Sequence, residues 1–278
     1  MSQPVSLKSR PALKPSNAAR TGGSQIRILR LTKQLILYLS ILFLFIPLAR
    51  PQQHNMHNMP EMSMKVPTGP EDPAQAAKRL ADKQESEFNH HLAGIFVILA
   101  GMFILAESNL AKRWALVRYA WPVCFLAAGL FVLIFSDTEL WPFGPQSPWY
   151  GITHNTEDLQ HKIFAVVLLT LGLVEVQRAR GRLKSPSAAF VFPVLGVAGA
   201  ILLLLHVHSG DMQAPNAMEA MENIQKQHRW FAATGMGIAL ANGVAGLAKA
   251  PQWMQQFCRT AWPVLLIVLG LLLTQYTE

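Results

Sequence analysis

The sequence predicts an all-α protein, a polytopic membrane helical bundle in which an N-terminal signal or anchor helix precedes six transmembrane helices arranged as three hairpin repeats. Of its 278 residues, 51% are apolar and only 14% are charged, whereas soluble domains average about 25% charged. Seven hydrophobic runs divide the chain, and the Lys and Arg residues gather between them. The net charge of +8 therefore reflects membrane topology and not nucleic-acid binding.

The first run, 35–49, follows a tail that carries seven Lys/Arg and no acidic residue. This layout is typical of a signal sequence with a long basic n-region or of a retained anchor, and the sequence leaves both readings open. We therefore divide the chain into a basic cytoplasmic tail at 1–33, a signal or anchor helix at 34–50, an exported linker at 51–87 and a six-helix membrane domain at 88–278.

Six further runs are near the length of membrane spans, and the shorter ones must borrow flanking residues. They lie at 91–106, 117–135, 162–176, 188–206, 230–248 and 261–276. Nine Lys/Arg occur in three alternate loops, at 107–118, 175–184 and 249–259. The intervening loops, 136–160 and 207–227, carry only Lys226. Because cationic loops stay in the cytoplasm, we expect these two loops and the linker to face outside.

Landmarks recur along the six runs and indicate three hairpins of one pattern. The second, fourth and sixth runs open with an aromatic residue, proline and valine, at Trp121-Pro122, Phe192-Pro193 and Trp262-Pro263. The first, third and fifth runs begin at histidines, namely His91, His161 and His228. The alternative is that aromatic residues and proline are simply frequent at interfacial helix ends.

All nine histidines map to the expected outer side, and this points to a shared role. Ionisable residues at the ends of spans are costly, although a single helix-end histidine is often only interfacial. Of the adjacent pair His90 and His91, we expect His91 to face the bundle because it keeps the register of the repeat. His206 and His208 lie about 200° apart around a helix, so they share a site only if the helix ends between them. The candidate metal ligands are His90, His91, His154, His161, His206, His208 and His228.

Carboxylates accompany these histidines. Thr156 is expected to cap a helix whose first turn holds Glu157 and Asp158. His161 then follows Glu157 by four residues on the same helix face, so a carboxylate can orient the imidazole. The accessory oxygen donors are expected to be Asp137, Glu139, Glu157 and Asp158.

The segment 54–64 reads HNMHNMPEMSM and packs two histidines and four methionines into eleven residues. Imidazole binds copper, zinc and iron, whereas thioether selects copper(I). We expect an exported copper-capture arm built from His54, Met56, His57, Met59, Met62 and Met64. A Met-rich disordered linker is the alternative.

Five motifs, taken in order, resemble bacterial membrane proteins of the copper resistance D (CopD) type. They are FNHHLAG, DTELWP, LQHKIF, LLHVHSGD and HRWFA, and the resemblance covers roughly residues 85–278. It implies a multi-pass protein of the bacterial inner membrane that handles copper, with histidines near the periplasmic face. The residues in matching motifs are His90, His91, His161, His206, His208 and His228.

Three hypotheses for function follow. The first is an inner-membrane copper-binding protein for copper homeostasis, uptake or resistance, with membrane lipid and a periplasmic copper protein as partners. The second is a membrane haem b-type redox protein with bis-histidine ligation between helices. The third is an assembly partner of a periplasmic metalloprotein. The sequence contains no nucleophile triad, phosphate loop or nucleic-acid stripe, so we expect no enzyme activity unless a redox role follows from haem.

Overall fold

A computed structural model describes residues 73–206 and 217–278. The helices are α2 (Pro73–Leu110), α3 (Ala120–Phe135), α4 (Pro148–His154), α5 (Thr156–Ala179), α6 (Val191–Leu204), α7 (Ala217–Gly246) and α8 (Gln252–Leu273). The 3₁₀ turns η2 (Ala115–Tyr119) and η3 (Pro186–Phe190) lead into α3 and α6. No β-strand occurs within the two described ranges, so the all-α prediction is confirmed there. The basic tail, the signal or anchor helix, the capture arm and His208 lie outside them.

Five segments are long and apolar enough to cross a membrane, and they define a multi-pass membrane protein. They are Pro73–Leu110, Ala115–Phe135, Thr156–Ala179, Pro186–Leu204 and Gln252–Leu273. Large apolar side chains on their outer faces are exposed, such as Ile95, Leu173 and Val194, as expected for a surface that contacts lipid. Helix α7 is not among the five, because its first half carries charges and its second half is rich in Ala and Gly.

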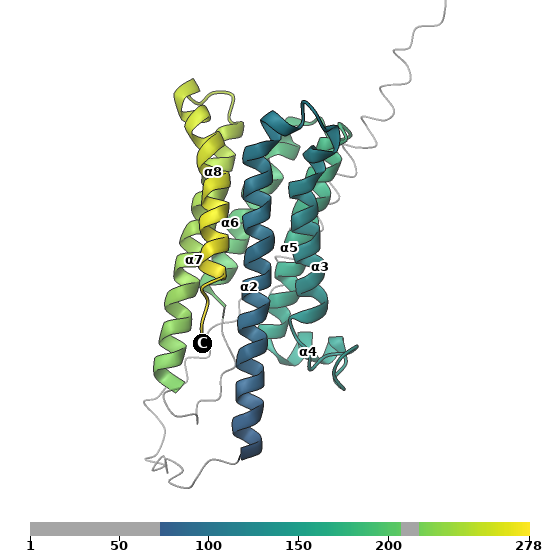
Figure 1. Cartoon of the computed structure of the whole chain (residues 1–278), viewed down its shortest axis with the longest axis vertical. Coiled ribbons are helices and arrows are strands. Elements are labelled where there is room, and N and C mark those ends of the chain that lie inside the picture. Colours follow the sequence, from purple (N-terminus) through teal and green to yellow (C-terminus); the bar gives the residue numbers. More distant parts are fainter. Residues whose placement is uncertain (1–72, 207–216) are drawn as a thin grey trace, which may run out of the picture. The chain divides into compact units, whose positions relative to one another are not determined.

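The six long helices run along one common direction (Figure 1), and the contacts between them connect them into a ring in chain order. Each helix packs mainly against its neighbours in the sequence, and α8 closes the ring against α2. A close approach of α2 and α8 joins Gly94 and Gly270, where a Cβ on either residue would lie 2.7 or 2.6 Å from the other's carbonyl oxygen. Small residues allow such contact between membrane helices. The contact between α5 and α6 is the smallest of the six, and this seam lies beside the candidate site.

Helix α2 begins at Pro73, inside the segment 51–87, which the sequence predicts to be a linker. The added turns are rich in Ala, Lys, Glu and Gln, which favour helix. Ion pairs one turn apart support them: Lys78–Asp82 at 3.9 Å and Lys83–Glu87 at 3.7 Å. Local helix propensity thus extends the first helix beyond its apolar part.

Three aromatic rings meet between α3, α6 and α8, and we call them the aromatic cluster: Trp121, Phe192 and Trp262. Their centroids are 6.5, 6.0 and 5.3 Å apart. These residues precede the prolines of the proposed repeat, so the three landmarks share one place in the fold. The local backbone differs, because α3 and α6 begin two residues before their proline whereas Pro263 lies well inside α8. The threefold repeat therefore stays a prediction.

Candidate metal centre

Four histidines from four parts of the ring form a row, which we call the histidine row: His161, His206, His228 and His90. His161 belongs to α5, His206 follows α6, His228 lies on α7 and His90 on α2. Successive ring centroids are 5.3, 5.1 and 5.9 Å apart. Tyr276, just after α8, ends the row, with its ring stacked on His90 at 3.8 Å. Residues that are distant in sequence therefore converge at one level of the bundle.

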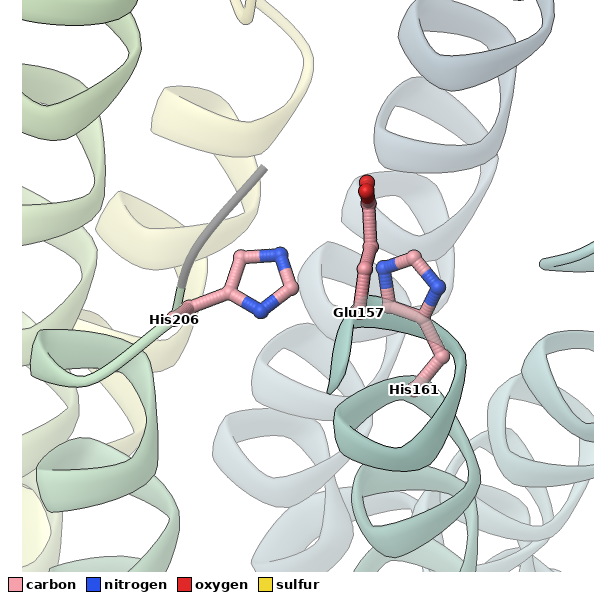
Figure 2. A group of neighbouring side chains, drawn as sticks. All are labelled: Glu157, His161 and His206. Atoms are coloured by element: carbon pink, nitrogen blue, oxygen red, sulfur yellow. The ribbon is translucent and has the colours of Figure 1, made fainter. Parts of the chain in front are cut away.

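One group in the described ranges has the spacing of a metal site: Glu157, His161 and His206. One donor atom from each residue lies within 4.8 Å of the others, and all three residues are half-buried. Figure 2 shows His206 reaching across the α5–α6 seam toward the other two side chains. Metal–nitrogen and metal–oxygen bonds are about 2 Å long, so a single ion can contact all three donors after small side-chain adjustments.

Hydrogen bonds at the α5–α6 seam set the tautomers of His161 and His206. The His161 Nδ1–H donates to Asp137 Oδ1 at 2.7 Å. Gln160 donates from Nε2 to the Leu205 carbonyl at 2.9 Å, which directs its Oε1 toward His206. His206 Nδ1–H donates to that oxygen at 2.6 Å. In the neutral form of each imidazole, this bond leaves the lone pair on Nε2, a nitrogen that can bind a metal.

His228 and His90 make the same kind of Nδ1 hydrogen bond, each to a backbone carbonyl of its own helix. The His228 Nδ1–H donates to the Ile224 carbonyl at 2.8 Å, and the His90 Nδ1–H donates to the Ser86 carbonyl at 2.8 Å. A carbonyl oxygen only accepts, so these rings also place their lone pair on Nε2. Bonds of this kind orient metal-binding histidines in proteins. All four rings of the row therefore share one feature, an Nδ1 hydrogen bond to an oxygen acceptor.

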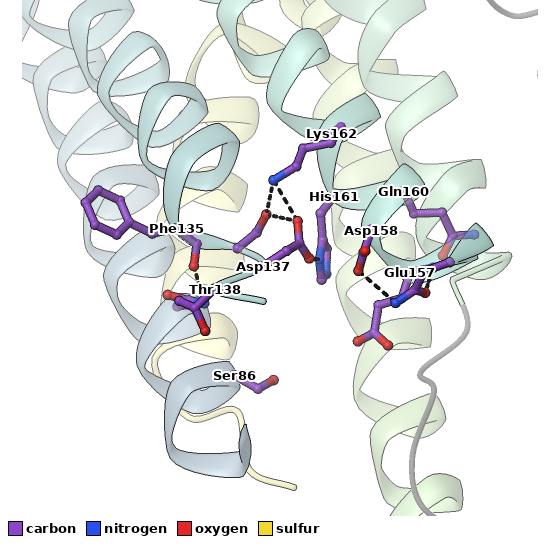
Figure 3. Close-up of polar contacts among 12 residues, drawn as sticks. Ser86, Phe135, Asp137, Thr138, Glu157, Asp158, Gln160, His161 and Lys162 are labelled. Carbon is purple, nitrogen blue, oxygen red and sulfur yellow. Dashed lines mark hydrogen bonds and ion pairs between the residues drawn. The ribbon is translucent and has the colours of Figure 1, made fainter. Parts of the chain in front are cut away.

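Asp137 places a negative charge beside Nδ1 of His161 (Figure 3). Its side chain is only 6% exposed and also receives Lys162 Nζ at 2.7 Å and Ser136 Oγ at 2.6 Å. Burial alone would raise the pKa of Asp137, but the hydrogen bonds from His161, Lys162 and Ser136 lower it to about 2. Asp137 is thus an ionised carboxylate that orients the His161 ring.

The first turn of α5 differs in one detail from expectation. Asn155 caps the helix, in place of Thr156, because its Oδ1 accepts the Glu157 backbone N–H at 2.9 Å. Glu157 and Asp158 do occupy the first turn. The buried Asp158 accepts from Asn155 Nδ2 at 2.8 Å. Asp158 therefore helps to fix the cap, whereas Glu157 belongs to the metal-like group.

Three other predicted ligands lie outside both the histidine row and the metal-like group. The ring beside His228 is that of His90, while His91 donates from Nε2 to the Tyr276 carbonyl at 3.0 Å. His154 is exposed at the end of α4 and stacks on Tyr150 at 4.2 Å. Glu139 is exposed and pairs with Lys78 at 3.3 Å. The order of His90 and His91 thus differs from the repeat-based expectation, because the α2 register turns His90 toward α7.

Two residues of the site were not predicted. Gln160, which is buried, links α5 to α6 and to His206. The buried Tyr276 packs its ring on His90 and donates its hydroxyl to Glu278 Oε1 at 2.9 Å; burial raises its pKa. A signal was present for each. Gln160 precedes His161 in the motif LQHKIF, and Tyr276 follows Trp262 by the same interval that separates Phe192 from His206.

Comparison of the chain with protein-family models, curated proteins and solved structures finds no match. The class of protein is therefore defined by its own geometry. It is a multi-pass helical membrane protein with a metal-like group of two histidines and one glutamate.

Proposed function

We propose that this chain is a copper-binding protein of the bacterial inner membrane that serves copper homeostasis, uptake or resistance. Glu157, His161 and His206 hold the ion at the periplasmic end, with α7 as a sixth span. The observation that carries the proposal is the convergence of four imidazoles from four parts of the helical ring, each with Nδ1 bonded to an oxygen acceptor.

Metal binding explains this arrangement better than interfacial placement does. A histidine that merely lies at a membrane surface has no reason to turn toward histidines of other helices. His228 is 4% exposed and keeps its ring 5.1 Å from that of His206. Burying polar rings is unfavourable unless hydrogen bonds or a metal compensate. A metal ion would also join α5 and α6 where their packing is smallest.

Copper is favoured by the donor types. Imidazole nitrogen and carboxylate oxygen suit copper(II), while the methionines of the capture arm at 54–64 suit copper(I). The CopD-like motifs include His161, His206 and His228. The cation-poor loops on this side favour a periplasmic location.

The test is metal analysis of purified full-length protein after equilibration with Cu²⁺ and removal of excess ion. We expect bound copper in the wild type and its loss from this site in the His161→Ala/His206→Ala double variant. His154→Ala is the matched control, because that histidine lies outside the row, and it should retain the wild-type copper content. Equal copper in the double variant and the wild type would refute the proposal.

Haem is a second candidate because neighbouring histidines of the row come from different helices, as in bis-histidine haem proteins. An optical spectrum separates the two. A Soret band in the purified protein that disappears in His206→Ala would replace copper with haem. If the protein is only an assembly partner, neither metal content nor spectrum will depend on these histidines.

A further inference from the structure

We infer that the connection between α3 and α5 docks the end of the bundle that carries the histidine row onto the lipid headgroup layer of the membrane. Four exposed aromatic side chains, which we call the interfacial patch, make this contact: Trp141, Phe143, Trp149 and Tyr150. They are 69, 53, 74 and 51% exposed. Exposed apolar side chains gathered in one short segment mark a surface that binds a protein or a membrane. This membrane contact goes beyond the proposed copper binding and does not depend on it.

The loop that carries the patch is held by its own bonds. Leu140 is 2% exposed and fastens the loop to the rest of the protein. The backbone N–H of Trp141 donates to the Gln146 carbonyl at 2.7 Å, and the Gln146 N–H donates to the Glu139 carbonyl at 3.2 Å. A loop bonded in this way keeps its aromatic side chains exposed instead of burying them, and such exposure is unfavourable in water. The loop therefore presents the patch to a surface outside the protein.

The patch continues the lipid-facing surface of the membrane spans. The ring of Phe143 stacks on that of Phe135, the last residue of α3, with centroids 5.1 Å apart. Phe135 stacks on Phe131, one turn earlier, at 5.4 Å, and Phe88 of α2 meets Phe131 edge to face at 6.4 Å. Phe135 is exposed and points away from the polar residues around Asp137 (Figure 3). One line of aromatic rings thus leads from the spans into the loop, and this continuity identifies lipid as the partner.

The chemistry of the patch selects the headgroup layer. Tryptophan and tyrosine collect in that layer because each combines an apolar ring with one polar N–H or O–H group. Residues 136–156 contain no Lys or Arg, so attraction to anionic lipids does not contribute. Both acidic side chains in this range, Asp137 and Glu139, pair with lysines of the protein. The surface that the patch recognises is therefore a phospholipid interface, whatever the charge of its headgroups.

The contact also sets the depth of the metal-like group. Asn89, which precedes His90, donates from Nδ2 to the Phe135 carbonyl at 3.1 Å. Two residues after Phe135, Asp137 accepts from His161 at 2.7 Å. Phe135 thus belongs both to the line of aromatic rings and to the level of the histidine row. With the patch in the headgroup layer, the metal-like group lies at the membrane surface, where an ion enters from water without crossing the hydrocarbon region.

The experiment measures tryptophan fluorescence of the full chain in vesicles of brominated phosphatidylcholine, since bromine quenches rings that lie near it. The Trp141→Phe/Trp149→Phe double variant keeps the aromatic rings but removes both emitters. Subtracting its emission from that of the wild type isolates the patch. We expect this difference to lose more intensity to bromines close to the headgroups than to bromines near the bilayer centre. Replacing part of the lipid with anionic phosphatidylglycerol should leave the loss unchanged.

Trp262→Phe is the matched control, because Trp262 is 9% exposed within the aromatic cluster and the emission that it contributes should be quenched less by bromines near the headgroups. Circular dichroism shows that both variants are folded. Emission from the patch that ignores brominated lipid but is quenched by aqueous iodide would overturn the inference, because the loop would then stand in water and face a soluble partner. Stronger quenching near the bilayer centre would overturn it as well. No step uses copper, so failure of the proposed function leaves this result unaffected.

Discussion

The aromatic cluster and the histidine row close the same helical ring in different ways. Helix α6 joins them, since Phe192 lies in its first turn and His206 just after its last, about 21 Å further along. The cluster packs three aromatic rings edge to face. The row consists of imidazoles whose orientation is set by hydrogen bonds to oxygen. The aromatic cluster is suited to stabilise the fold, and the histidine row is suited to bind a ligand.

The proposed binding site lies where the packing between neighbouring helices is weakest. The α5–α6 contact is the smallest in the ring, and Gln160 bridges it by bonds to Leu205 and His206. A ligand at this seam adds an interaction that apolar packing does not provide. Stability without metal should therefore depend on the aromatic cluster, and the response to metal should depend on the row. Four changes test this separation.

Phe192→Ala should have the largest effect on the metal-free protein. Its side chain is 3% exposed and contacts both tryptophans of the cluster, so truncation leaves a cavity that costs about 3 kcal/mol. We expect a clear fall in melting temperature in detergent, with copper affinity unchanged within about twofold. Phe190→Ala, at an exposed position in η3, is the control. Loss of copper affinity at constant stability would contradict this division of roles between the aromatic cluster and the histidine row.

Copper should stabilise the wild type by a similar amount. At a free ion concentration one hundred times the Kd, binding to the folded state alone adds about 2.7 kcal/mol. The melting temperature should therefore rise with Cu²⁺ in the wild type and in His154→Ala, but not in His206→Ala. If His206→Ala were stabilised as much as the wild type, copper would be acting away from the row.

Asp137→Asn should reveal the acid sensitivity of the metal-free row. The folded-state pKa of Asp137 is about 2, below its ordinary value near 3.8. Ionised Asp137 therefore stabilises the folded state fully above about pH 4, and this contribution is lost as the pH falls toward 2. The difference corresponds to about 2 kcal/mol. Chemical unfolding at pH 7 and pH 3 measures it, and Asp137→Asn should depend less on pH than the wild type. Equal pH slopes in the two proteins would argue against an ionised, bonded Asp137.

Much of the fold could be predicted because membrane spans leave a strong local signal. Apolar runs located five spans, and the interval between aromatic–proline motifs identified three residues that meet in the aromatic cluster. The start of α2 was missed because its first turns are polar and resemble a linker. Helix propensity and ion pairs such as Lys78–Asp82 determine that part, rather than hydropathy.

The site could be predicted only in outline. Sequence placed His161, His206 and His228 near one depth, but depth does not give the rotation of a helix. The choice between His90 and His91 depended on that rotation, and the structure brings His90 to His228. Gln160 and Tyr276 belong to neither the histidines nor the carboxylates, so the pattern of these residues in the sequence does not mark them. Their roles follow from contacts between distant segments, which sequence patterns do not specify.

Tyr276→Phe should produce the smallest change and marks the limit of the row. The substitution keeps the ring stacked on His90 but removes the hydroxyl that donates to Glu278. Loss of one such bond costs about 1 kcal/mol, so the metal-free melting temperature should fall slightly. Copper affinity should stay within about twofold, because the hydroxyl faces a carboxylate and not the row. Tyr276→Ala, which also removes the ring stacked on His90, should lower the metal-free melting temperature further. If Tyr276→Phe abolished copper binding, the phenol would be a ligand and the row would not end at His90.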